Sequence, residues 1–235
     1  MSSTQKKYTE ILKKDFNTLL IDPLIALANA ERTDRSLEND AQCAERMKVN
    51  IDTTFTAFQT HLSKGSNRLK EAGIWPQERV EKRFSYLLVH RQEAEEELKK
   101  GSTLQTLLHL TDDELLLFYQ EAMYKYQDNH NVQAEDLLLL LTYLNPLISS
   151  FWVALGAVQI KKQDFEAASY SHILGAELGD EYFSSYLLAT ECLLQLQYND
   201  KAQQILERAK NRLGENPHFQ IFRPQIEALF VKAKK

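Results

Sequence analysis

The chain has 235 residues but only 7 glycines and 5 prolines, and residues that favour helices are abundant. This composition predicts a helical protein with few β-turns, built as one large domain or two small ones. The formal net charge is -5, and residues 101–235 alone contribute -6, so the acidic C-terminal half argues against nucleic acid as the main partner.

The N-terminal part is helical by pattern but contains no repeat that can be phased. Residues 8–31, "YTEILKKDFNTLLIDPLIALANAE", hold apolar residues at helical spacing and are broken or kinked at Pro23. A second segment over about 36–63 has an apolar face at helical spacing. This face consists of Met47, Ile51, Phe55, Phe58 and Leu62.

Residues 64–77, "KGSNRLKEAGIWPQ", are interpreted as a linker or turn because glycine, asparagine and proline punctuate them. A third helix is expected to begin near Pro76, a favoured first helical position, and to run to Gly101. We therefore expect residues 1–100 to form a helical extension. The pattern leaves open whether its helices bundle within one chain or dimerise.

The rest of the chain repeats with a period of 34 residues, which is the period of tetratricopeptide (TPR) helical hairpins. Four positions of the repeat keep their residue class through three copies. A large residue comes first, a small one follows four positions later, an alanine falls on the second helix, and a small residue or leucine closes the unit. The four series are Phe118, Trp152 and Tyr186; Ala122, Gly156 and Thr190; Ala134, Ala168 and Ala202; and Leu141, Gly175 and Ala209.

These residue types suit paired helices. The large residue fills the space between the two helices, and the small one lets the second helix approach. The alanine sits where the helices cross. The turn between the helices lacks its usual glycine, since Asn129, Gln163 and Gln197 stand there. Glutamine adopts a left-handed conformation poorly, so we expect turns that are longer or differently shaped.

The sequence thus predicts an all-α fold: a three-repeat TPR solenoid with a C-terminal capping helix, preceded by the N-terminal helical region. Pro146 ends one repeat, and Gly214 stands at the corresponding place two repeats later. The expected helices cover 112–127, 131–144, 149–161, 165–178, 182–196 and 199–212. The expected domains are 1–100; 101–214, with repeats over about 115–148, 149–182 and 183–214; and the cap over 215–235.

The five consecutive leucines from Leu137 to Leu141 fall on the second helix of repeat one. The apolar run is shorter than the ~20 residues that a membrane span requires. A helix inside a solenoid is covered on several sides, so we interpret the run as core. The N-terminus lacks the continuous apolar segment of a signal peptide. The expectation is a soluble cytoplasmic protein, without stable membrane insertion.

Stacked TPR units offer a concave groove lined by the first helix of each repeat. Apolar side chains with tyrosine and methionine suit an extended peptide that carries a few apolar anchors. The alternative is that these residues contact the N-terminal helices or the capping helix instead. The predicted groove residues are Leu116, Tyr119, Met123, Tyr126, Val153, Ala157, Ile160, Leu187, Glu191 and Leu194.

No pattern of catalysis or cofactor binding is found. The two cysteines, Cys43 and Cys192, are far apart, and the six histidines form neither an HExxH motif nor a cluster of ligands. No phosphate-binding glycine loop is present. We therefore expect a non-enzymatic protein with no catalytic residues, no metal and no cofactor. An enzyme hidden in residues 1–100 would need a pocket of perturbed titratable groups, which nothing in the sequence suggests.

Three stretches resemble the class II chaperones of bacterial type III secretion, the LcrH/SycD type that serve translocator proteins. They are "LKKGSTLQTLLHLTDDELLLFYQEAMYKYQ", "LGAVQIKKQDFEAASYSHILGAEL" and "LLATECLLQLQYNDKAQQILERAK". The resemblance covers about 60% of the chain. Two departures stand out: His172 replaces a residue that is often aromatic in the family, and residues 1 to about 94 exceed the family's short N-terminal arm.

The resemblance implies a cytoplasmic chaperone that uses no nucleotide. It would hold an extended N-terminal segment of a hydrophobic translocator or effector protein in the groove before export, with Tyr119 and Tyr126 among the groove residues. It also implies a possible homodimer through N-terminal helices. The competing hypothesis is a TPR scaffold that bridges folded partners by binding a folded surface or a charged C-terminal tail.

Overall fold

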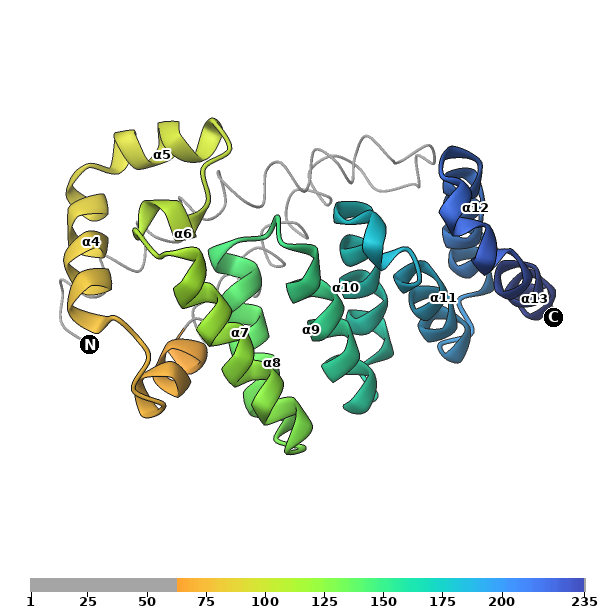
Figure 1. Ribbon diagram of the computed structural model, residues 1–235, viewed down its shortest axis with the longest axis horizontal. Helices are drawn as coiled ribbons and strands as arrows, with labels where there is room; N and C mark the ends of the chain where they lie inside the picture. The colour runs from red at the N-terminus through yellow and green to blue at the C-terminus, as the bar shows by residue number, and fades with distance from the viewer. Residues whose placement is uncertain (1–62, 235) are drawn as a thin grey trace, which may run out of the picture.

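The computed structural model describes residues 63–234, and this part of the chain is helical without a strand. Three helical hairpins follow one another in a row, and consecutive helices pack side by side (Figure 1). The pairs are α7 (Asp112–Gln127) with α8 (Asn131–Leu144), α9 (Ser149–Lys161) with α10 (Phe165–Leu178), and α11 (Ser185–Gln195) with α12 (Asn199–Glu215). The predicted TPR fold is confirmed. The finer division into domains at residues 100 and 214 stays a prediction.

The helix bounds follow the sequence closely in the first two repeats. Thr111 caps α7 with its side chain on the backbone N–H of Glu114, whose carboxylate accepts from the backbone N–H of Thr111. This reciprocal capping box fixes the first turn of the array. The third repeat begins differently: a 3₁₀ turn, η2 (Asp180–Tyr182), precedes α11, which starts three residues later than expected.

The N-terminal elements correct two expectations. The segment read as a linker is helical over 63–71, and its Leu69 is fully buried. The single helix expected from Pro76 to Gly101 is two helices, α4 (Gln77–Val89) and α5 (Arg91–Lys99), separated at His90. The two segments expected over 8–31 and 36–63 lie outside the described residues, apart from Ser63.

A short helix, α6 (Leu104–Leu107), links α5 to the first repeat. Arg83 of α4 donates from Nε to the carbonyl of Leu107 at 2.8 Å, and Arg79 pairs with Glu114 at the start of α7. The Trp75 ring lies 5.6 Å from the ring of Phe118. The N-terminal elements are therefore attached to repeat one by polar and aromatic contacts.

The positions that repeat every 34 residues are the ones that the fold buries. The three alanines on the second helices, Ala134, Ala168 and Ala202, have no exposed surface. Trp152 is the exception among the large residues: it is half-buried, and its indole N–H donates to the carbonyl of Pro146 at 2.8 Å. The Trp152 side chain therefore stabilises the turn between two repeats in addition to packing between the helices.

Two glycines show how close the helices of the second repeat lie. A Cβ atom on Gly175 would fall 2.5 Å from Cγ2 of Val153, and one on Gly156 would fall 2.8 Å from the His172 ring. Both distances are below any van der Waals contact, so only glycine fits without a shift of the neighbouring side chains. The expected close approach of α9 and α10 is confirmed.

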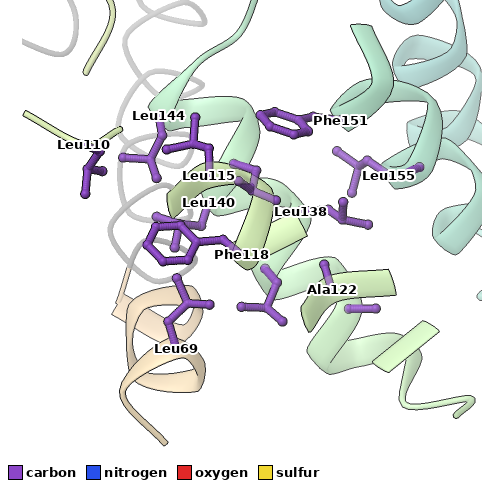
Figure 2. Close-up of a cluster of buried hydrophobic side chains, with 14 of the residues drawn as sticks. Leu69, Leu110, Leu115, Phe118, Ala122, Leu138, Leu140, Leu144, Phe151 and Leu155 are labelled. Atoms are coloured by element: carbon purple, nitrogen blue, oxygen red, sulfur yellow. The ribbon is translucent and has the colours of Figure 1, made fainter. Parts of the chain in front are cut away.

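The buried side chains form two clusters. The first contains the leucine run and joins repeat one to α9, and Figure 2 shows Leu138, Leu140 and Phe118 within it. The second joins the end of α10 to repeat three and the C-terminal helices. The interpretation of the leucines as core is confirmed, although Leu139 is only partly buried. Within residues 63–234 no helix is both long enough and apolar enough to cross a membrane.

The three turns within the hairpins share one conformation, contrary to expectation. Asn129, Gln163 and Gln197 have φ angles of 61°, 63° and 60°. In each turn this residue donates to the carbonyl three residues earlier, and the next residue donates to the carbonyl five residues earlier. This is the Schellman closure of a helix, which needs a left-handed residue at that place. Glutamine accepts the strain because two hydrogen bonds hold the turn.

The C-terminal end also corrects one prediction, because Gly214 does not end its helix. α12 runs through it to Glu215 and stops before Pro217, whose ring excludes the helical conformation from Asn216. A 3₁₀ segment, η3 (Pro217–Phe222), leads into α13 (Arg223–Ala233). Ile226 and Leu229 are buried in the second cluster, whereas Ile221 is 71% exposed.

The strained turns generate a prediction. We expect the double change Gln163→Gly with Gln197→Gly to raise the free energy of unfolding by about 1 kcal/mol, because glycine adopts positive φ without the cost that an L-residue carries. Urea unfolding followed by circular dichroism measures the change. Gln204→Gly, at an exposed position inside α12, is the matched control and should lower stability by about 1 kcal/mol. Destabilisation by the double change would contradict this account of the turns.

Candidate peptide-binding groove

The ten predicted groove residues lie on α7, α9 and α11, the first helices of the three repeats. None is fully buried: Leu116 and Glu191 are exposed, and the other eight are half-buried. On the same helices the residues at the repeat's large position, Phe118 and Tyr186, are completely buried. Each first helix therefore turns one flank to the core and leaves the predicted flank partly open to solvent.

Tyr119 is the most closely packed of the predicted tyrosines. Its ring lies 5.5 Å from the ring of Phe151 on α9, in a tilted arrangement. Burial raises the pKa of the Tyr119 phenol, and the nearby phenol of Tyr182 raises it further. The phenol stays protonated, so it can donate a hydrogen bond to a carbonyl. Tyr182, which the repeat pattern did not single out, belongs beside this position.

The ring of Tyr126 contacts a cation that the sequence analysis did not predict. The ammonium of Lys161, at the end of α9, lies 3.9 Å from the centre of the Tyr126 ring, which is a cation–π contact. The same ammonium donates to the carbonyl of Tyr126 and to Oδ1 of Asn129, both at 3.3 Å. Lys161 therefore adds a basic group beside this predicted groove residue. The signal was its place four residues after Ala157, on the same helix face.

Several other apolar groove residues pack against buried side chains of the core. Met123 packs against the first cluster, and Leu187 and Leu194 pack against the second. Val153 lies directly beneath Gly175 of α10. The core thus holds these side chains in place while part of each surface stays open, which suits a preformed site.

His172 lies beneath the groove, on α10 against Gly156 of α9. It is fully buried, and neither ring nitrogen has a hydrogen-bond partner. Burial lowers the pKa of its imidazole to about 4, so the ring is neutral at physiological pH. The neutral imidazole packs here as an aromatic ring would, and its two ring nitrogens lower stability because they are buried without hydrogen bonds.

Two features of the described residues bear on metal binding and on cysteine reactivity. Among residues 63–234 no three His, Cys, Asp or Glu side chains are grouped as metal ligands would be. Cys192 is buried, and burial raises the pKa of its thiol to about 11, which keeps the thiolate population negligible at neutral pH.

Comparisons with known proteins agree with the fold and with the resemblance. No family model matches the chain. Over 140 residues it is 27% identical to the low calcium response locus protein H of Yersinia pseudotuberculosis serotype I (strain IP32953), covering 59% of this chain and 83% of that protein. A chain of a T3SS complex from Aeromonas hydrophila is 23% identical, with a TM-score of 0.54, over 61% of this chain and 95% of its own. The Yersinia enterocolitica type III secretion translocator chaperone SycD is 25% identical over 55% of this chain and 97% of its own, with a TM-score of 0.47.

The stacked hairpins and the half-open face on their first helices define a TPR protein. Within that class, the chain is a homologue of the low calcium response locus protein H, so the resemblance predicted from the sequence is confirmed.

The buried histidine generates a prediction about pH. The folded pKa of about 4 lies below the ordinary value of 6.5, so the unfolded chain binds the proton first as pH falls. Stability from this group is complete above pH 6.5 and is lost as pH falls toward 4. Between pH 7 and about pH 5 the loss is about 2 kcal/mol.

We expect His172→Phe to remove this loss and also to raise stability at pH 7 by about 1 kcal/mol, since no polar atom is left unpaired. The measurement is urea unfolding of both proteins at the two pH values. His218→Phe, at an exposed position, is the control and should leave the pH dependence unchanged. An equal difference between variant and wild type at both pH values would show that His172 is not the titrating group.

Proposed function

We propose that this protein is a chaperone of a bacterial type III secretion system. It binds an extended segment of a hydrophobic translocator protein in the groove on α7, α9 and α11, and so keeps that protein soluble in the bacterial cytoplasm before export. The observation that carries the proposal is the row of half-buried side chains on three consecutive first helices, in a homologue of the low calcium response locus protein H.

The chemistry of the groove suits apolar anchors on an extended chain. Each well-buried aliphatic anchor contributes about 1.5–3 kcal/mol of hydrophobic stabilisation. Because the groove side chains already rest on the core, little of this is lost in ordering them. The phenols of Tyr119 and Tyr126 add apolar area together with a hydroxyl that can donate to the peptide backbone. The protein acts by binding alone, without a catalytic step or cofactor.

The position of Lys161 bears on the alternative, a scaffold that captures a charged C-terminal tail. A single ammonium in this part of the groove already contacts an aromatic ring, a carbonyl and an amide oxygen. Glu191, on α11, adds a negative charge to the same row of residues. Capture of a carboxylate would have to displace the contacts of Lys161 and face this charge, so the groove favours an apolar segment.

Self-association is a further property that the resemblance implies. It would use N-terminal helices, and residues 1–62 lie outside the described part of the chain. The proposal therefore includes homodimerisation as a property that is separate from peptide binding in the groove. The groove residues of one chain suffice for the proposed binding.

The proposal predicts the effect of removing the two phenols. Tyr119→Ala with Tyr126→Ala should weaken binding of translocator-derived peptides by about tenfold or more, because buried aromatic anchors are where truncation costs most. Fluorescent peptides tiled along the N-terminal region of a bacterial type III translocator protein report the affinity. Tyr124→Ala is the matched control, since Tyr124 lies on the same helix and is 57% exposed.

Tyr119 also packs on Phe151, so loss of folding has to be separated from loss of binding. Ala157→Lys serves this purpose, because it adds a long charged side chain at a half-buried groove position and removes no packing. Unchanged peptide affinity in both variants, with wild-type melting, would rule out this groove. Retained binding of a folded partner by both variants would favour the scaffold.

A further inference from the structure

The outer face of the second helices differs among the three repeats. The positions in question are three residues, spaced by four, that recur with the period of 34. In α8 they are Asp136, Leu140 and Leu144; in α10 they are Tyr170, Leu174 and Leu178; in α12 they are Gln204, Arg208 and Arg212. We refer to the three residues on α10 as the α10 stripe.

In the first repeat this face is covered. Asp136, Leu140 and Leu144 are 2%, 0% and 0% exposed. The helical segment 63–71 lies on it so closely that a Cβ atom on Gly65 would fall 2.7 Å from both the carbonyl oxygen of Asp136 and Cβ of Leu140. The glycine at position 65 therefore allows the N-terminal segment to pack directly against α8.

In the third repeat the same face is polar and satisfied. Arg212 donates to the carbonyl of Ala176 at 2.9 Å, and Arg208 pairs with Glu177 at 3.8 Å. The second repeat is neither covered nor polar. Tyr170, Leu174 and Leu178 are 57%, 40% and 41% exposed, and they form a continuous apolar row along two turns of α10. An exposed row of this kind marks a docking surface.

The chain just before residue 63 continues the pattern that covers α8. Gly65 and Leu69 are both buried at repeat one. Counting back from them in steps of three and four reaches Leu62, Phe58, Phe55, Ile51 and Met47. One unbroken apolar seam at helical spacing therefore runs from residue 47 to residue 69, and only its last part is used on α8.

The length of the segment matches the distance to be crossed. α10 packs on α9, which packs on α8, and neighbouring helices lie about 8–10 Å apart. At the 1.5 Å rise per residue of the helix that the sequence predicts over about 36–63, the fourteen residues from Gly65 back to Ile51 would span about 21 Å. Residues 47–62 can thus reach the next second helix along the array.

We propose that residues 47–62 of the same chain dock on the α10 stripe and extend along the outer face of the array the cover that 63–71 provides for α8. The N-terminal extension then acts as a strap over the convex face of repeats one and two, on the opposite side from the client groove. This proposal does not depend on the groove's function.

A photo-cross-linking experiment on the full chain tests it. Tyr170→p-benzoylphenylalanine places the reactive ring on the α10 stripe, and Gln204→p-benzoylphenylalanine places it at the equivalent position of α12. A mixture of isotopically heavy and light chains is irradiated and the cross-linked peptides are mapped. We expect position 170 to cross-link to residues 47–62 within one chain, and position 204 not to do so.

Two further variants make the test specific. Phe55→Asp with Phe58→Asp should lower the cross-link yield at position 170 by about tenfold, since two apolar rings are lost from the seam. Thr53→Asp with Thr60→Asp places the same charges on the opposite helix face and should leave the yield unchanged. Cross-links between heavy and light chains would overturn the proposal in favour of a second copy. Cross-links to other segments, or none to residues 47–62, would overturn it in favour of an uncovered surface.

Discussion

The array depends on how closely two helices approach within each hairpin. Ala134, Ala168 and Ala202 have no exposed surface, and a methyl group is all that the crossing admits. In the second repeat the approach is closer still, since Gly175 leaves no room even for a Cβ atom beside Val153. This contact fixes the angle of each hairpin, and because identical hairpins stack, it sets the direction of every first helix.

The groove follows from the same constraint. The second helices cover one flank of α7, α9 and α11, and the predicted groove residues keep part of their surface open, although Val153 also contacts Gly175 of α10. The fold can expose apolar side chains there without loosening, because Met123, Leu187 and Leu194 still rest on the core. Predicted groove residues and packing residues therefore alternate on one helix. Eight of the ten predicted residues are half-buried, because the core covers part of each side chain.

Sequence periodicity was sufficient for the repeats because buried positions select for residue size. It located the helices of the first two repeats. Periodicity was insufficient where the backbone conformation depends on hydrogen bonds. Gln163 and Gln197 adopt a left-handed conformation, which glutamine normally disfavours. It also misjudged 63–71, where Gly65 looks like a turn residue and is instead a contact with α8. Periodicity did not predict the roles of Lys161 and Tyr182, because contacts between different repeats do not produce a regular spacing in the sequence.

The division of the interior into two clusters has a consequence for how the molecule opens. One cluster holds repeat one and most of α9, and the other holds repeat three, the C-terminal helices and Ala176 near the end of α10. Solenoids unfold in contiguous cooperative units, and the boundary between such units here falls inside the second repeat. The groove residues straddle it, from Tyr119 to Leu194. A segment bound along these residues, as proposed above, would couple the two units, and fraying of the C-terminal unit would release one end of that segment while the other stays held.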